Sequence, residues 1–426
     1  MRTNKILKQT LFYLVVAGII LVIITPIYFL VVISLMSDQE AYDWPTQIVP
    51  SFFNKFKLEI VNEKYLMSVY SNSKKKFITL IETENFEELQ KFVRNKTNSY
   101  IKMKLFDTQV KKLQKLIEKN AKKINDLRNE IATIEMKLNK TTVNLVKYKT
   151  KLEKAKKLNI ESLIQPLEKN IQDLENKKKS YEAKLNNLKD VLEKIGSVKF
   201  SVAKNLLDNY INFFKVSSNA WPALMRSIQV ALLTVAISLT IGGMAGYAFA
   251  RYNFKGKNFL KLSVLFVRMF PGISIAMPMV IILINMGFYD KPIGLSLVYS
   301  VGQIGMTIWI TASIFMGIST ELEEAAMIFG TTRIGAFFKV TLPLAFPGLA
   351  ASAMYAFIGS WSETAQAIVL TQFNPTFPVV VYQTLVGAKG LINLTAAGGV
   401  SLALPAVIFT LIIRKYILQM WGGVKV

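Results

Sequence analysis

The spacing that most strongly suggests function lies in residues 319–347, and the chemistry it suggests is protein contact. The segment begins Ser319-Thr320-Glu321-Leu322-Glu323-Glu324-Ala325-Ala326 and continues to Gly330, Val340, Leu342 and Pro343. Its pattern is E-A-A-x3-G-x9-V-x-L-P. Thr320 and Glu323 have the spacing of a capping box, which predicts that a helix begins here.

This predicted helix has the features of a lever. Ala325 and Ala326 are small, so a partner surface could approach the helix closely. Gly330 permits a turn into a second helix, whose end leads into an apolar segment. We expect a push on the helix pair to rotate the attached segments.

The chain lacks the two residue types, Cys and His, that most often carry acid–base, thiol and metal chemistry. The chain has no Cys and no His, which excludes disulfides, thiol nucleophiles, imidazole catalysis and zinc sites built from these ligands. It contains no GxxxxGK[ST] string, so it does not bind ATP by a P-loop. We therefore expect no catalytic residue, no metal and no cofactor of its own.

Composition divides the chain into an apolar part and a charged part. Of 426 residues, 52% are hydrophobic and 19% charged, with mean hydropathy +0.33 and net charge +24. Residues 54–205 hold 35 of the 52 Lys and Arg and 19 of the 28 acids. A soluble enzyme is therefore an unlikely class, and a membrane protein with a water-facing insert is favoured.

The apolar part contains six segments long enough to cross a bilayer, which needs about 20 residues of helix. They are Leu11–Leu35, Ala223–Ala250, Phe259–Gly287, Ile293–Gly317, Leu344–Leu370 and Leu391–Tyr416. The first is too long for a cleaved signal peptide and lacks a small-residue cleavage site, so we expect it to be retained.

Basic residues predict the orientation of these spans. With the N-terminus inside, the inside segments hold roughly twelve Lys and Arg and the short outside segments roughly four. Both termini are then cytoplasmic, and residues 37–220, which include the insert, are extracellular. The insert is left out of the count because long loops translocate regardless of charge.

Several spans carry features that either pack helices or line a path. Pro271, Gly272 and Pro278 interrupt the third span, Pro405 interrupts the last, and Gly242 and Gly246 form a small-xxx-small pair in the second. Close helix packing is the simpler interpretation, and bent helices that line a translocation path are the alternative.

Charged and polar residues within spans are costly and usually face a cavity or a partner. Arg268 and Glu363 could pair with each other or line the path. The most polar stretch of any span includes Ser360, Trp361, Ser362 and Glu363. Trp361 could stack on a sugar ring, although packing is the more common role, and Glu363 could have a structural role.

The insert contains a strong heptad pattern. One set of apolar residues recurs at every seventh position: Val110, Ile117, Ile124, Ile131, Leu138, Leu145 and Leu152. A second set includes Leu113 and Leu127. The pattern resumes after a turn at Lys156–Ser162, with Pro166 in the first helical turn. An antiparallel coiled-coil hairpin over 107–196 is predicted.

The insert also needs a base on which the hairpin rests. Phe77–Ile81 and Ile101–Leu105 are predicted as strands and Asn85–Val93 as a helix, which gives a small α/β base over 54–106. The Lys residues are interleaved with acids and lack a platform of aromatic residues, so nucleic acid is not expected as a partner.

The whole pattern resembles a known family. Residues 319–347 are similar to the EAA loop of binding-protein-dependent ABC importer permeases, with Val340 where Ile is common. Arg251–Gly256, Met269–Pro271, Thr395–Pro405 and the tail Gly422-Gly423-Val424-Lys425 resemble permeases of the MalG type for sugars. The resemblance covers residues 1–53 and about 205–426, whereas 54–204 depart from it.

The resemblance implies an all-α, six-span, type I importer permease carrying a large extracellular insert. Its parts would be 1–53 with the first span, the α/β base 54–106, the coiled coil 107–196, a return segment 197–222 and the permease core 223–426. Glu324, Ala325, Ala326, Gly330, Val340, Leu342, Pro343, Gly422, Gly423 and Lys425 would couple to the ATPase.

The resemblance also implies partners. They are a MalF-like permease, two MalK-like ATPase subunits that bind ATP and Mg²⁺, an extracellular lipid-tethered solute-binding protein and membrane lipid. The solute would be a maltodextrin-like oligosaccharide. Two alternatives remain: the same architecture importing glycerol 3-phosphate or another small solute, and a membrane-anchored coiled-coil adhesin or scaffold.

Overall fold

The protein consists of two compact units, each described here by itself. A computed structural model describes residues 2–43, 47–61, 64–157, 161–217, 219–387 and 391–421, without the side chains of 2–8, 86 and 417–421. The first unit comprises Met1–Ala41 and Leu207–Val426, and the second comprises Tyr42–Leu206. The tail residues Gly422, Gly423 and Lys425, for which coupling was predicted, lie outside the described residues.

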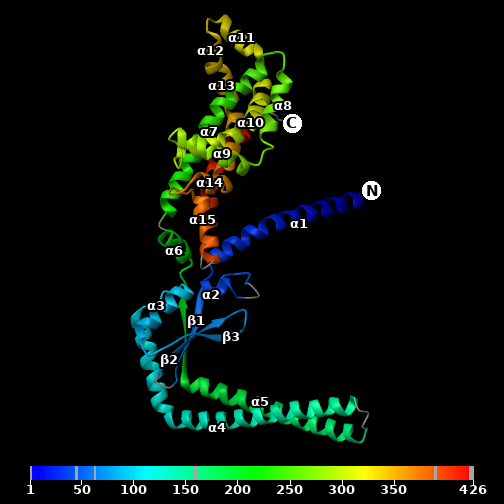
Figure 1. The fold of residues 1–426 in the computed structure, drawn as a ribbon, viewed down its shortest axis with the longest axis vertical. Helices are drawn as coiled ribbons and strands as arrows, with labels where there is room; N and C mark the ends of the chain where they lie inside the picture. The colour runs from blue at the N-terminus through cyan, green and yellow to red at the C-terminus, as the bar shows by residue number, and fades with distance from the viewer. Residues whose placement is uncertain are drawn as a thin grey trace. The chain divides into compact units, whose positions relative to one another are not determined.

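The first unit is a set of long apolar helices (Figure 1). Five described helices are long and apolar enough to cross a membrane, within Gln9–Ser34, Ala220–Arg251, Pro292–Met316, Arg333–Trp361 and Ile392–Tyr416. They belong to helices α1 (Arg2–Ser34), α7 (Ala220–Arg251), α10 (Pro292–Met316), α13 (Leu342–Trp361) and α16 (Ile392–Trp421).

A sixth candidate span is broken. Helices α8 (Lys257–Val267) and α9 (Gly272–Asn285) meet at a bend of 90° and count as one span only if taken together. Pro271 stands directly before α9, where its ring cannot continue the preceding helix. The third span was predicted at Phe259–Gly287 with an interruption at Pro271 and Gly272, and the bend between α8 and α9 lies at these residues.

The fifth predicted span, Leu344–Leu370, is also too long. Helix α13 ends at Trp361, and residues Ala365–Leu370 form a separate short helix, α14. Shorter helices complete the unit: α2 (Asp38–Ala41), α6 (Asp208–Val216), α11 (Thr320–Ile328), α12 (Arg333–Ala336), a π-helical turn η1 (Phe337–Thr341) and α15 (Phe377–Val386).

Small residues determine how α7 and α10 pack. A side chain at Gly242 would lie 2.7 Å from Thr307 Cγ2, and one at Gly246 would collide with Thr311 Oγ1. Thr311 Oγ1 in turn donates to the carbonyl oxygen of Gly242 at 3.2 Å. Such close backbone approach and interhelical hydrogen bonding are typical of helices in lipid, so the packing interpretation of this glycine pair is supported.

The second unit contains a four-stranded antiparallel sheet in the order β3-β2-β1-β4. Its strands are β1 (Phe53–Val61), β2 (Lys64–Ser71), β3 (Lys76–Thr83) and β4 (Ser197–Ala203). Alternation explains β1, because Phe56 and Leu58 are buried whereas Lys55 is exposed. Phe56 pairs with Val69 of β2 and with Phe200 of β4.

The core of this unit lies between the sheet and two helices. Helix α3 (Phe86–Thr97) contributes Leu89, the start of α4 (Met103–Lys157) contributes Phe106 and Leu113, and all three are fully buried. The predicted strand at Phe77–Ile81 lies within β3. The helix predicted at Asn85–Val93 corresponds to α3, of which Asn85 is the N-cap. The strand predicted at Ile101–Leu105 is wrong, because α4 begins at Met103.

Helices α4 and α5 (Glu161–Gly196) lie side by side along a hairpin (Figure 1). Ion pairs join Lys149 to Glu175 at 2.7 Å and Glu130 to Lys184 at 2.9 Å, so residues later in α4 face residues earlier in α5. The helices are therefore antiparallel. The centre of the predicted turn, residues 158–160, lies outside the described residues.

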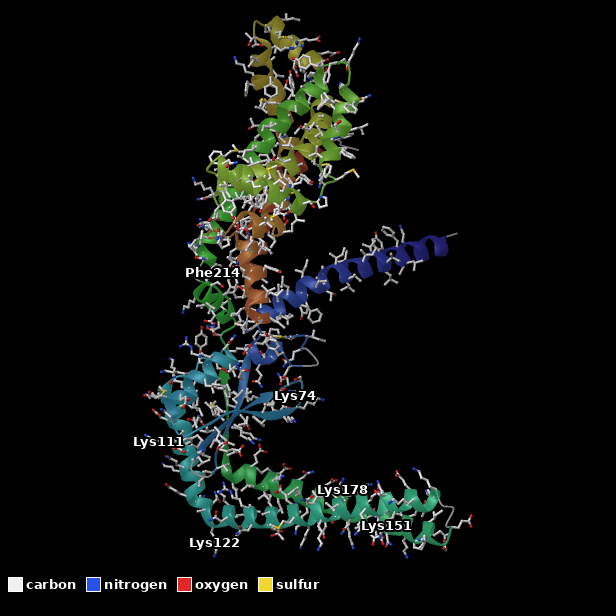
Figure 2. All side chains as sticks on the ribbon, in the orientation of Figure 1. Lys74, Lys111, Lys122, Lys151, Lys178 and Phe214 are labelled. Carbon is white, nitrogen blue, oxygen red and sulfur yellow. The ribbon has the colours of Figure 1, made fainter. Side chains whose placement is uncertain are left out.

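The hairpin buries part of the heptad pattern and exposes its lysines. Ile124, Ile134 and Leu145 are among the buried residues of α4. Figure 2 labels Lys122 and Lys151, two exposed lysines of α4. Helix α4 is kinked at Asn120, whose φ of −114° and ψ of 15° are not helical, and the heptad pattern did not predict this kink.

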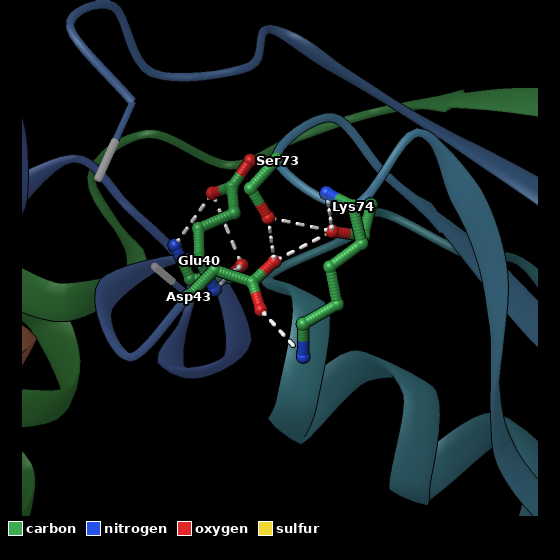
Figure 3. Close-up of polar contacts among 6 residues, drawn as sticks. Glu40, Asp43, Ser73 and Lys74 are labelled. Atoms are coloured by element: carbon green, nitrogen blue, oxygen red, sulfur yellow. Dashed lines mark hydrogen bonds and ion pairs between the residues drawn. The ribbon is translucent and has the colours of Figure 1, made fainter. Parts of the chain in front are cut away.

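A buried carboxylate fixes the start of the second unit to the β2–β3 turn (Figure 3). Asp43 Oδ2 accepts hydrogen bonds from Ser71 Oγ at 2.7 Å and Ser73 Oγ at 2.8 Å, and its Oδ1 lies 3.4 Å from Lys74 Nζ. Burial works to raise the pKa of Asp43, but these two hydroxyls and the Lys74 ammonium bring it below its ordinary value.

Candidate coupling site

The EAA segment forms a helix that begins differently from the prediction. The side chain of Ser319 caps α11 by accepting a hydrogen bond from the backbone N–H of Glu321 at 3.2 Å. The capping box of Thr320 and Glu323 is therefore wrong. Glu323 is 6% exposed and points its carboxylate toward other elements.

Glu323 accepts hydrogen bonds from three side chains of other elements. Tyr247 Oη donates to Oε2 at 2.8 Å. Arg251 Nε donates to Oε1 at 2.8 Å, and Thr341 Oγ1 donates to the same oxygen at 2.7 Å. Arg251 Nη2 also lies 2.8 Å from Oε1 as an ion pair, without the geometry of a hydrogen bond. One carboxylate thus joins α7, α11 and η1.

Charge and burial at this carboxylate oppose each other. Burial works to raise the pKa of Glu323, but hydrogen bonds from Thr341, Tyr247 and Arg251, with the charge of Arg251, bring it below its ordinary value. Glu323 is therefore ionised near neutral pH. Loss of either charged partner would leave a buried charge unpaired, which typically costs about 3–5 kcal/mol.

Aromatic rings and a backbone contact reinforce the junction. The ring of Tyr247 lies 5.4 Å from that of Phe315 in α10 and 4.8 Å from that of Phe337 in η1. Arg251 Nη1 donates to the carbonyl oxygen of Ile318 at 3.0 Å, just before α11. The base of the EAA helix is therefore held by the ends of two spans.

The turn after α11 follows the prediction. Gly330 has φ of +89°, a conformation that favours glycine, and its N–H donates to the carbonyl oxygen of Met327 at 3.0 Å. Thr332 then caps α12 by accepting from the N–H of Gly335 at 3.1 Å. From Arg333 the chain is helical through α12, η1 and α13 to Trp361, so α12 and α13 have no loop between them.

The face of α11 away from Glu323 is open. Glu324 and Ala325 are exposed and Ala326 is half-buried. Two large apolar side chains beside them, Ile328 and Phe329, are 84% and 88% exposed. Figure 1 shows α11 and α12 together at one end of the helical unit. The site therefore exposes acidic and apolar side chains on a helix that is anchored through Glu323.

The other predicted coupling residues differ in exposure. Gly330 and Pro343 are exposed, and Val340 and Leu342 are half-buried. Sequence reasoning missed Tyr247, Thr341 and the anchoring role of Arg251 and Glu323. The available signal was that Glu323 precedes the EAA triplet while Arg251 ends the second span, because an acid and a base at adjoining helix ends can pair.

The residues predicted to line a path divide into two groups. Ser360 is buried and donates to the carbonyl oxygens of Ala356 and Phe357 at 2.9 and 3.0 Å. Trp361 is 3% exposed, stacks on Phe357, and donates from Nε1 to the carbonyl oxygen of Leu402 at 2.9 Å. Both residues pack the interior in this conformation, so neither lines an open path here.

Ser362, Glu363 and Arg268 are more accessible. Ser362 is exposed, and Glu363 is half-buried and accepts from the N–H of Gln366 at 3.1 Å. The guanidinium of Arg268 lies over the ring of Tyr355 at 5.2 Å. In the described part of the chain, Arg268 and Glu363 form no ion pair with each other.

The helical unit is similar in sequence to known proteins. Residues 238–419 match the family described as binding-protein-dependent transport system inner membrane component. A trehalose transport permease of Mycobacterium tuberculosis is 35% identical over 215 residues, which are 49% of this chain and 78% of that protein.

Two further relatives align with a similar share of this chain. An arabinooligosaccharide transport permease of Halalkalibacterium halodurans is 31% identical and covers 51% of this chain and 79% of its own. A trehalose/maltose transport permease of Thermococcus litoralis is 30% identical, with coverage of 51% and 79%. A solved bacterial alginate importer gives a TM-score of 0.42 at 20% identity, covering 51% of this chain and 82% of that chain.

Proposed function

Because this chain belongs to the family of binding-protein-dependent transport system inner membrane components, we propose that it is the permease subunit of an ABC importer for a carbohydrate. It is a multi-pass protein of the cell membrane and a transport subunit rather than an enzyme. ATP is hydrolysed by a separate subunit.

The proposed solute is a neutral oligosaccharide of the maltodextrin kind. The names of the three relatives cited above refer to trehalose, arabinooligosaccharides and maltose, which are uncharged sugars. A phosphorylated solute would call for a cluster of cations among the spans. Two ionisable residues, Arg268 and Glu363, are predicted to lie deep within the spans. Only Arg268 is cationic, so these residues do not form a cluster of cations that could bind a phosphate group.

The observation that carries the mechanism is the anchoring of α11 by Glu323. The exposed surface of Glu324, Ala325, Ile328 and Phe329 would dock in a groove of the ATPase subunit. Motion of the ATPase would then turn α11 as a rigid body, since its base is tied to α7 through Tyr247 and Arg251. Thr341 carries the same motion into α13, so the spans rotate and access alternates.

The partners and orientation form part of this proposal. Two ATPase subunits, a second MalF-like permease and an extracellular lipid-tethered binding protein would complete the importer. Both termini and the α11–α12 pair would face the cytoplasm, and residues 37–220 would face outward. The tail Gly422–Lys425 would reach toward the ATPase, and Ser362 and Glu363 would border the path.

Reconstitution tests this function. The chain would be purified with its co-expressed partner subunits, inserted in liposomes and assayed for uptake of labelled trehalose and maltotriose with the binding protein present. We expect uptake that requires ATP and stops when the ATPase subunits are left out. Uptake by the chain alone, or purification without any ATPase, would contradict the proposal.

A further inference from the structure

The second unit contains a large cleft outside the residues that match the permease family. Its volume is about 1040 Å³. One wall is the sheet, with Lys57 of β1 and Phe77 of β3, and the other is the kinked part of α4, with Ile117 and Arg128. The end of α5 closes it with Glu193. The kink at Asn120 lies between Ile117 and Ala121, so the cleft occupies the bend of α4.

The cleft carries an excess of positive charge. Six cationic residues line it, namely Lys57, Lys75, Lys76, Arg128, Lys189 and Lys199, against the three acids Glu59, Asp190 and Glu193. Two of the acids are engaged inside the cleft. Glu193 Oε1 lies 3.5 Å from Lys57 Nζ and 3.2 Å from Lys199 Nζ, and Glu59 pairs with Lys57.

Lys189 is engaged by Glu135 at 2.8 Å, whereas three other cations of the cleft have capacity to bind an anion. Lys75 in the β2–β3 turn and Lys76 at the start of β3 are exposed, and neither forms an ion pair within the described residues. Arg128 uses Nη2 to donate to the carbonyl oxygen of Ile60 at 3.2 Å, which leaves other guanidinium N–H groups for a ligand. Guanidinium and ammonium groups on opposite walls would both face a molecule seated in the cleft.

Two aromatic residues add an apolar surface among these charges. Tyr70 and Phe77 line the cleft, and their rings lie 5.3 Å apart in an edge-on arrangement. The ammonium groups of Lys57 and Lys199 lie 5.5 and 5.2 Å from the Phe77 ring. Aromatic rings beside fixed polar groups are the usual lining of a ligand site, and they suit the C–H face of a sugar ring.

We propose that this cleft binds an anionic oligosaccharide, with its carboxylates or sulfates on Lys75, Lys76 and Arg128 and a sugar ring against Tyr70 and Phe77. The choice of a saccharide rests on the proposed function, whereas the preference for an anion rests on the cleft alone. The second unit would then hold a polyanionic glycan at a site distinct from the transport path.

Binding to the full-length chain in detergent tests this inference. Trigalacturonate, maltotriose and the tripeptide Glu-Glu-Glu would be titrated by calorimetry, because they separate acidic sugar, neutral sugar and acidic peptide. We expect trigalacturonate to bind most tightly, and to bind less well as salt is raised because exposed charges are screened.

Matched variants locate the site. The double charge reversal Lys75→Glu with Lys76→Glu should weaken trigalacturonate binding about tenfold or more. The control, Lys111→Glu with Lys112→Glu, makes the same change in net charge at exposed positions that do not line the cleft, and should weaken it by less than about threefold. Arg128→Gln provides a second variant, with an expected loss of about fivefold.

Three results would overturn the inference. They are equal binding of maltotriose, equal or tighter binding of the acidic tripeptide, and an equal effect of the control variant. Uptake of neutral sugar by the reconstituted importer is measured separately, so failure of the cleft leaves the proposed transport function standing, and failure of transport leaves the anion preference testable.

Discussion

The two units of this chain bury opposite kinds of side chains. The first exposes large apolar side chains, such as Val22 at 74% and Phe259 at 72%, while Thr234, Thr307 and Thr311 are fully buried. The second buries Phe56 and Phe106 completely and exposes lysines. The first unit therefore suits lipid, where small and hydroxyl residues make the contacts between helices. The second unit suits water, where large apolar residues form the core.

The largest expected effect is on the water-facing core. Phe106→Ala removes a fully buried ring from between the sheet and α4, so it should lower the stability of the second unit by about 4 kcal/mol. Hydrogen exchange of β1 and α3 in the purified chain measures this loss. Met136→Ala, at a side chain 74% exposed, is the control and should leave exchange unchanged. Equal exchange in the two variants would show that Phe106 does not stabilise the core of the second unit.

The next effect concerns the buried carboxylate of Glu323 in the lipid-facing unit. Glu323→Gln leaves Arg251 buried without its counter-charge, so it should destabilise the attachment of α11 by about 3 kcal/mol. Hydrogen exchange or limited proteolysis at residues 318–331 measures it. Glu321→Gln, on the same helix but exposed, should have little effect. Similar protection in both variants would refute the anchoring role.

Glycine substitutions separate packing from helix propensity. Gly246→Ala should cost about 2 kcal/mol because its methyl group meets Thr311 and the backbone of Ala312. Gly243→Ala meets nothing within 4 Å and should stabilise α7 slightly, since Ala favours helix over Gly. The melting temperature of the purified chain would fall in the first variant and hold or rise in the second. The reverse order would exclude close α7–α10 packing.

The smallest effect is a pH dependence of the second unit. The pKa of Asp43 is lowered in the folded state, so its contribution to stability is present above the unfolded pKa and is lost as pH falls through the folded value. Exchange of the β2–β3 hairpin should therefore accelerate below about pH 4. Asp43→Asn should remove this dependence. An unchanged acid profile in the variant would assign it to other carboxylates.

Composition sufficed to predict which segments form the apolar helices, because 20 or more apolar residues leave few alternatives. Sequence could not show where a span breaks: Pro271 indicated a bend but not one of 90°, and Trp361 ends α13 without a proline. Three of the four strands were missed. In β1, Lys55, Lys57 and Glu59 alternate with the buried residues and weaken the apolar signal of a strand that lies inside the sheet.

The candidate site shows the same limit. Sequence spacing located α11 and the turn at Gly330, because caps and positive φ depend on neighbouring residues. It assigned Glu323 to a local capping box, whereas the carboxylate is bound by Tyr247 and Arg251, more than 70 residues earlier in the chain. Partnership over that separation depends on how α7 packs, and the position of Arg251 at the end of the second span was the only signal of it that the sequence offered. The kink at Asn120 was likewise not predicted from the heptad pattern.

If α11 transmits work from a separate ATPase, the ratio of ATP hydrolysed to sugar imported should depend on its exposed surface. The ratio would be measured in liposomes for the unaltered importer, for Glu324→Lys, and for Glu321→Lys as an exposed charge reversal on the same helix. We expect at least about a tenfold rise in ATP consumed per sugar for Glu324→Lys and less than about twofold for the control. An unchanged ratio for Glu324→Lys, with full uptake, would contradict it.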